Sequence, residues 1–151
     1  MMGRHSSEEH AEQRIVAAYL RDALKPPVFW TAIDHATQSE AEGGRKKAMG
    51  VKDGLADLWL FVPSAPPSLT TLVICIEMKR KELPVGLFRK KKRPAGTLSK
   101  SQVDRWPEMR AANIRLHIAY SVEDVVTILT SYGIPLHARL MSSGAVLKAP
   151  S

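Results

Sequence analysis

The sequence predicts an α/β fold in which helices flank a central mixed β-sheet. Helical and strand patterns follow one another in the order helix, strand, helix, strand, strand, helix, strand, helix, which is typical of a layered α/β sandwich. A Pro/Ser-rich connection joins the two strongest strand patterns and predicts a hairpin. One of these strands, LVICIEMK, is apolar on both sides in its first half, which indicates a central strand covered on both faces.

In the first half of the chain, each element has a local signal. A Ser-x-x-Glu capping box, SSEE, followed by apolar residues at helical spacing predicts a helix at about 8–24, which the Pro-Pro pair ends. VFWTAI, 28–33, is rich in β-forming residues and predicts a strand. A second Ser-x-x-Glu signal at Ser39 starts another helix, and Gly50 closes it, although the Gly-Gly pair within it lowers its helix propensity.

The second half continues with the hairpin strands, at about 56–62 and 72–79. A helix then starts at Ser99, a strand covers 114–120, and Ser121 caps a last helix that stops at Gly133. We expect one domain spanning residues 1–151, with a core at about 9–133, a basic loop at about 80–98 and a C-terminal tail at about 134–151. The last residues of the tail, LMSSGAVLKAPS, are expected to be loosely held.

Composition excludes some classes of site. The single cysteine, Cys75, lies in an apolar run and is best interpreted as a small buried hydrophobe, so neither an internal disulfide nor a cysteine zinc cluster is possible. No apolar run approaches the roughly 20 residues that a membrane span needs, so we expect a soluble protein of the cytoplasm.

The net charge of +7 is concentrated in one segment. Residues 79–93 hold eight Lys or Arg and one Glu, a local net charge of +7, so the remainder of the chain is neutral. Such a block attracts polyanions without sequence preference and suits a phosphate backbone. The alternative is a solvated loop with no partner, since basic runs are common.

Two carboxylates and a lysine mark the ends of the hairpin strands. Glu77 and Lys79 lie two residues apart on one strand and therefore share a face, and Asp57 opens the neighbouring strand at hairpin distance. Like charges this close need a cation, and an oxygen-rich pair suits Mg²⁺ or Mn²⁺, to which the Met78 carbonyl could add a further ligand. The competing interpretation is a surface ion pair at a strand end.

Four blocks in this order carry a family resemblance: GVKDGLADLWLF, VICIEMKRK, LSKSQVDRW and IRLHIAYSVEDVVTIL. Together they resemble the virus-type replication-repair nuclease family, VRR-NUC, of the PD-(D/E)xK superfamily, over about residues 9–133. The resemblance implies a restriction-endonuclease-like core and Mg²⁺- or Mn²⁺-dependent endonucleolytic hydrolysis of DNA phosphodiesters. Small single-domain members look like phage or prophage proteins of replication, recombination or repair, often homodimeric and directed at branched or junction DNA.

The resemblance also assigns residues. Asp57 and Glu77 match the metal-binding carboxylates and Lys79 matches the catalytic lysine, whereas Glu9 and Gln13 reproduce a Glu and Gln of the first helix, near the metal and the DNA. Gln102 matches a catalytic-site glutamine, but it also completes a Ser-x-x-Gln capping box and could serve only the helix start. The residues expected to bind DNA phosphates are Lys81, Arg89, Lys90, Lys91, Lys92, Arg93 and Lys100.

Two departures and one competing function remain open. Where related sequences carry Asn-Gly this chain has His35-Ala36, and its connection from Lys79 to Ser99 is longer and more basic than expected. The competing function is a non-catalytic DNA-binding module or accessory subunit that keeps the fold. Basic charge fits that function equally well, but it does not require the Asp, Glu and Lys set.

Overall fold

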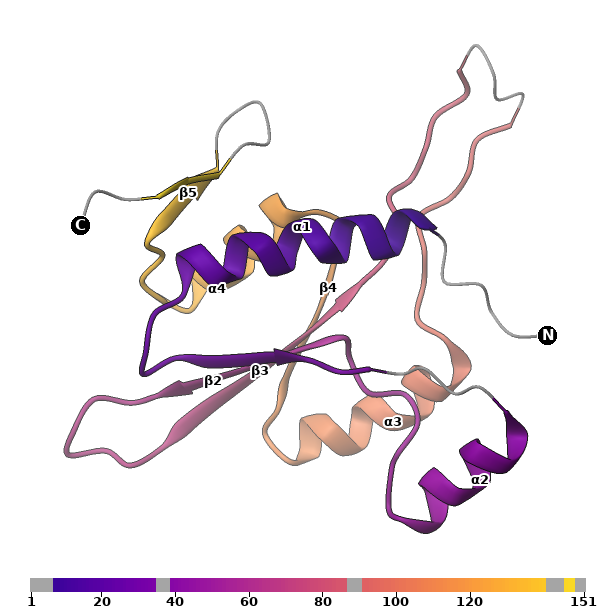
Figure 1. Cartoon of the computed structure of the whole chain (residues 1–151), viewed down its shortest axis with the longest axis horizontal. Coiled ribbons are helices and arrows are strands. Elements are labelled where there is room, and N and C mark those ends of the chain that lie inside the picture. Colours follow the sequence, from indigo (N-terminus) through magenta and orange to yellow (C-terminus); the bar gives the residue numbers. More distant parts are fainter. Residues whose placement is uncertain (1–6, 35–38, 87–90, 141–145, 149–151) are drawn as a thin grey trace.

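The computed structural model of the chain describes residues 7–34, 39–86, 91–140 and 146–148 (Figure 1). Its elements are α1 (Ser7–Ala23), β1 (Phe29–Ala32), α2 (Glu40–Ala48), β2 (Leu58–Pro63), β3 (Thr71–Met78), α3 (Lys100–Ala111), β4 (Arg115–Ala119), α4 (Val122–Ser131), β5 (Ala138–Leu140) and β6 (Val146–Lys148). The first eight follow the predicted order, with boundaries shifted by only a few residues.

The main sheet is mixed and has the strand order β1-β2-β3-β4. β1 and β2 are antiparallel, β2 and β3 form the predicted hairpin, and β3 pairs with β4 in parallel. The parallel pair requires a crossover connection, and α3 supplies it. The prediction of a mixed sheet is therefore confirmed.

Helices cover both faces of this sheet, as Figure 1 shows: α1 and α4 lie on one side and α3 on the other. The larger core packs Ile74, Ile76 and Met78 of β3 against α1 and α4. The smaller core packs Cys75 of the same strand against Trp106 and Met109 of α3. Alternate residues of β3 thus enter opposite cores, and the strand is the doubly covered central strand that the sequence predicts.

Serine caps start three helices where the sequence places them. The hydroxyls of Ser39, Ser99 and Ser121 accept hydrogen bonds from the main-chain amides three residues later. A cap of this kind satisfies one of the amides that the first helical turn leaves unpaired. The predicted box at Ser6 lies outside the described residues.

The predicted C-terminal tail, about 134–151, begins with residues that belong to the fold. Ile134 and Ala138 are buried in the larger core, and β5 pairs with β6 beside α1. Two hydrogen bonds hold this segment: the His137 amide donates to the Ala23 carbonyl at 2.8 Å, and the Tyr19 hydroxyl donates to the Ala138 carbonyl at 3.1 Å. Strands this short have no periodic pattern, so tertiary contacts with α1 determine their structure.

The described parts of the basic loop, residues 80–86 and 91–98, extend beyond the sheet at the end where β3 stops, in the upper right of Figure 1. Leu83 and Arg93 exchange two main-chain hydrogen bonds of 2.9 Å, which hold the two sides of the loop together. No helix within the described ranges is long and apolar enough to cross a lipid bilayer.

Candidate active site

The hairpin places Asp57 and Glu77 opposite each other. Leu58 pairs with Ile76, so the residues one position further, Asp57 and Glu77, lie across from one another at the same end of the two strands. The Asp57 carbonyl accepts a hydrogen bond of 2.8 Å from the Ile33 amide, which anchors its main chain to the segment after β1. Both side chains point to the α3 side of the sheet, since they alternate with residues of the larger core.

These carboxylates and Lys79 are buried. Asp57 is 8% exposed, Glu77 1% and Lys79 7%. Lys79 Nζ lies 2.7 Å from Glu77 Oε1, and Asp57 Oδ2 accepts a hydrogen bond of 2.9 Å from the Met78 amide. Glu77 Oε2 is buried and has no hydrogen-bond partner among the described residues. The interpretation of Glu77 and Lys79 as a surface ion pair is thereby excluded, and the sheet end holds a carboxylate oxygen ready to accept a ligand.

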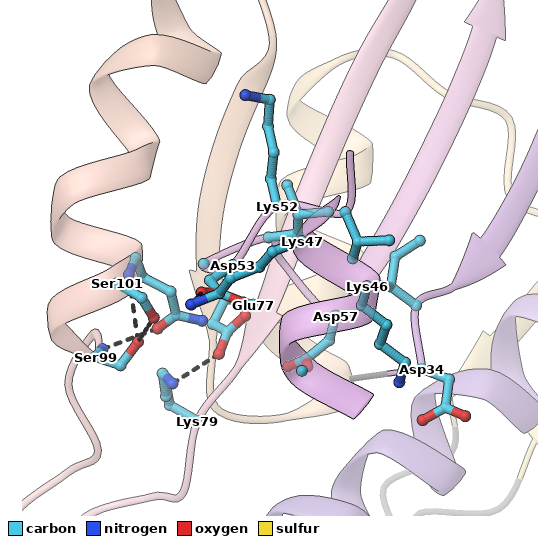
Figure 2. A pocket seen from close by; sticks show the side chains of 16 residues that line it. Asp34, Lys46, Lys47, Lys52, Asp53, Asp57, Glu77, Lys79, Ser99 and Ser101 are labelled. Carbon is cyan, nitrogen blue, oxygen red and sulfur yellow. Dashed lines mark hydrogen bonds and ion pairs between the residues drawn. The ribbon is translucent and has the colours of Figure 1, made fainter. Parts of the chain in front are cut away.

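Asp57, Glu77 and Lys79 line a cleft of about 340 Å³, shown in Figure 2. One wall is α2 with the loop that follows it, and the other is the first turn of α3 with the serine that caps it. Figure 2 shows Lys47 extending from α2 toward the side where Ser99 and Ser101 lie, whereas Lys46 runs toward Asp34. The buried floor of the cleft is therefore carboxylate-rich, and one of its exposed walls carries lysines.

Glycine is required where the two walls meet. Gly54 has a φ of +80°, and a Cβ added there would lie 2.2 Å from the Ser101 carbonyl oxygen. Only a residue without a side chain lets the loop before Asp57 pass this close to α3. The Arg105 side chain fastens the same loop by a hydrogen bond of 3.2 Å from Nε to the Asp53 carbonyl.

Gln102 has the capping function that the sequence left open. The side-chain oxygen Oε1 of Gln102 accepts a hydrogen bond of 2.9 Å from the main-chain amide of Ser99, and the main-chain amide of Gln102 donates to Ser99 Oγ at 3.3 Å. It is also 7% exposed and lines the cleft. Capping thus fixes the side chain beside Lys79 and Glu77, and its role in the reaction stays a prediction.

Other predicted site residues lie near the floor without lining the cleft. Glu9 Oε1 accepts a hydrogen bond of 3.2 Å from the Arg80 amide, which places the start of α1 beside the end of β3. Gln13 is half-buried one turn further along α1. The Met78 side chain packs in the larger core, and its main-chain amide, rather than its carbonyl, is what contacts Asp57. The predicted metal-binding roles of Glu9 and Met78 remain predictions.

The predicted DNA-binding residues are spread over the surface outside the cleft. Lys81 pairs with Glu12 at 3.6 Å, Lys92 with Glu82 at 2.6 Å, and Lys100 with Asp104 at 2.7 Å. The hydrogen bond to Asp104 raises the pKa of Lys100. Lys91 is exposed and Arg93 is half-buried, whereas Arg89, Lys90 and His35 lie outside the described residues.

Lys46, Lys47, Asp53 and Ser101 line the cleft without having been predicted as site residues. A signal for the lysines was present in SEAEGGRKKAMG, a helical segment with almost no large apolar residue. A helix without an apolar stripe has no core to cover, which favours a surface function.

The burial of Cys75 determines the protonation state of its thiol. Desolvation raises the pKa of the Cys75 thiol to about 12, so it stays protonated within the smaller core. Cys75 is the buried hydrophobe that the sequence predicts.

The donor set of the floor fits a magnesium-type ion. No three or more His, Cys, Asp and Glu side chains gather into a metal-binding group in the parts of the chain that the structure describes. A site with two carboxylates suits Mg²⁺, which is bound by one or two carboxylates and completes its shell with water and substrate phosphate. The unpartnered Glu77 Oε2 is a suitable oxygen donor for such an ion.

The fold and the cleft define a class: an α/β domain that buries Asp, Glu and Lys at adjoining strand ends of a mixed sheet, as restriction-endonuclease-like cores do. The chain is similar in structure to a VRR_NUC domain protein, with a TM-score of 0.51 and 16% sequence identity over 85% of this chain and 89% of that chain. The resemblance read from the sequence is therefore confirmed for the fold. No protein-family model matches the sequence, and neither does any curated protein.

Proposed function

We propose that the protein is a metal-dependent endonuclease that hydrolyses DNA phosphodiester bonds. The observation that carries this proposal is the burial of Asp57, Glu77 and Lys79 together at the floor of one cleft, with Glu77 Oε2 unpartnered among the described residues. A core without a function would gain nothing from two buried carboxylates, because desolvating them is costly. The fold shared with a VRR_NUC domain protein supports the same conclusion by analogy.

Each floor residue has a distinct role in this proposal. Asp57 and Glu77 would hold one or two Mg²⁺ or Mn²⁺ ions. Such an ion supplies Lewis-acid stabilisation of the phosphate charge and lowers the pKa of bound water. Lys79, held by Glu77, would orient the attacking water or stabilise the charge that develops on the phosphate oxygens. Gln102, fixed by its cap, would position the phosphate beside them.

Three finer features belong to the same proposal. The resemblance to small VRR-NUC proteins supports branched or junction DNA as the substrate and a place in phage or prophage replication, recombination or repair. It also supports a homodimer, because one active site cuts one strand and a paired cut needs two. Light scattering would measure the oligomeric state directly.

The experiment that tests the function is a cleavage assay on linear, flapped and four-way-junction DNA of matched sequence, with Mg²⁺, Mn²⁺ or EDTA. We expect cleavage with either metal and none with EDTA. Lys79→Ala should lower the cleavage rate by about 10²–10³-fold, the usual cost of removing one charge-stabilising group. Its DNA affinity should stay within a few-fold, since Lys79 is one of many basic residues.

The controls separate catalysis from folding. Lys79→Ala leaves the buried Glu77 carboxylate unpaired, which costs about 3–5 kcal/mol of stability. Lys79→Arg keeps the positive charge but replaces the compact ammonium, so it should fold and still lose most cleavage. Lys25→Ala, exposed just beyond the far end of α1, should cleave as the wild type does. Salt-sensitive binding without cleavage of any substrate would instead establish the non-catalytic DNA-binding module.

A further inference from the structure

The helix α2 lacks the usual reason for a helix to form on a protein. None of its residues, Glu40–Ala48, is buried. Most surface helices owe their stability to an apolar face that packs on the core. What holds α2 is local: its Ser39 cap, the ion pair of Lys46 with Glu42 one turn earlier, and the ion pair of Lys47 with Asp53 in the following loop. Packing therefore does not account for its position beside the cleft.

Two consecutive lysines of α2 line that cleft and a third consecutive basic residue does not. Lys46 and Lys47 line it together with Asp57 and Glu77, whereas the preceding Arg45 is exposed and lies outside the lining. Figure 2 shows Lys47 reaching from α2 toward the side of the cleft where Asp53 and Glu77 lie. The cleft thus combines a buried acidic floor with an exposed basic wall.

This separation of charge matches the two components of a metal-bound phosphodiester. The buried carboxylates attract a cation, and lysines at the mouth attract the phosphates on either side of the bond above it. The ion pair of Lys47 with Asp53 does not prevent this, because its side chains are 65% and 58% exposed and exposed ion pairs contribute about 0–1 kcal/mol. The ion pair of Lys46 with Glu42 is half-buried, with side chains 33% and 25% exposed, and pairs at this helical spacing contribute about 0.3–0.5 kcal/mol.

We propose that α2 is a phosphate-binding wall, in which Lys46 and Lys47 contact the DNA strand whose phosphodiester lies over Asp57 and Glu77. The proposal rests on the proposed function and adds to it the path of the cut strand, which passes between α2 and the first turn of α3.

The test compares three basic residues of one helical turn. DNA affinity of the full chain is measured in EDTA, where no cleavage occurs, with a fluorescein-labelled duplex over a series of salt concentrations. Lys46→Gln combined with Lys47→Gln should raise Kd about tenfold at low salt. It should also reduce the slope of log K against log salt by about 1.8, since each lost phosphate contact removes about 0.9.

Arg45→Gln is the matched control. It removes one positive charge from the same last turn of α2, where the double variant removes two, so the loss of helix-dipole stabilisation per residue is common to both variants. We expect its Kd to change less than twofold, and circular dichroism should show the same helix content in all three proteins. With Mg²⁺, the double variant should raise KM more than it lowers kcat.

The outcomes distinguish this inference from the proposed function. If the wild type binds and cleaves DNA but the double variant loses no more affinity than Arg45→Gln, α2 is not a phosphate-binding wall and the nuclease stands. If the wild type neither binds nor cleaves any DNA substrate, the proposed function falls and the wall with it.

Discussion

The floor of the cleft and the basic surface around it are built in opposite ways. Asp57, Glu77 and Lys79 are all less than 9% exposed and sit on strand ends fixed by main-chain pairing. By contrast, the side chains of Lys47 and Lys92 are more than 60% exposed, Lys47 on a helix with no buried residue and Lys92 on the basic loop. Rigid burial suits groups that must hold a metal and a reacting phosphate in place. Exposure suits side chains that only have to attract the phosphate backbone of DNA.

The difference teaches which measurement each region should control. Substitutions in the floor should change the cleavage rate with little change in DNA affinity, because the floor residues act on one phosphodiester. Changes to the basic surface are expected in affinity and salt dependence, because each lysine there neutralises one phosphate among several.

Gly54→Ala should displace the floor residues without removing any charge. Of the variants described from here on, it should have the largest effect. The new Cβ would clash with the Ser101 carbonyl at a backbone φ of +80°. Overpacking of this kind costs about 1–3 kcal/mol, and relieving it must move the loop that leads into Asp57. The midpoint of urea unfolding and the cleavage rate should both fall, while DNA affinity changes little.

Gly50→Ala is the control for this variant. Gly50 has a similar φ of +88°, but nothing lies within 4 Å of the Cβ position. It therefore carries the backbone cost alone, of about 1 kcal/mol. Equal stability losses in the two variants would show that the contact between Gly54 and α3 does not position the floor.

Lys91→Gln combined with Lys92→Gln tests the opposite region. Both side chains are exposed on the basic loop, and Glu82, 2.6 Å from Lys92, competes with DNA for that lysine. We expect Kd to rise several-fold and the salt slope to fall by up to about 1.8, with kcat unchanged. A fall in kcat as large as that of Lys79→Arg would contradict the division between floor and surface.

The same contrast explains what the sequence could predict. Alternation along β3 placed Glu77 and Lys79 on one face, and the hairpin placed Asp57 beside them, because strand pairing follows local pattern. Capping signals located α3 and α4 just as directly. The α2 wall was missed because residues 46–54 approach α3 through tertiary contacts that no period encodes, namely the close passage of Gly54 by Ser101 and the hydrogen bond from Arg105 to the Asp53 carbonyl. The β5–β6 pair was missed for a related reason: contacts with α1 determine its structure, and its own residues form no periodic pattern.

His117 offers the smallest effect and separates global stability from the chemistry of the floor. Its Nε2 lies 2.7 Å from the Tyr132 hydroxyl, and burial, with the nearby Arg110 charge second, lowers its pKa from 6.5. The unfolded chain therefore binds a proton more readily than the folded one, so stability is complete above about pH 6.5 and declines as the pH falls below it. His117→Gln should reduce this decline in melting temperatures taken at pH 7.5, 6.5 and 5.5. A decline that persists unchanged in the variant would assign it to other groups. Cleavage can be measured over the same pH interval. Any loss of cleavage that His117→Gln still shows does not come from His117 and is assigned to the floor of the cleft.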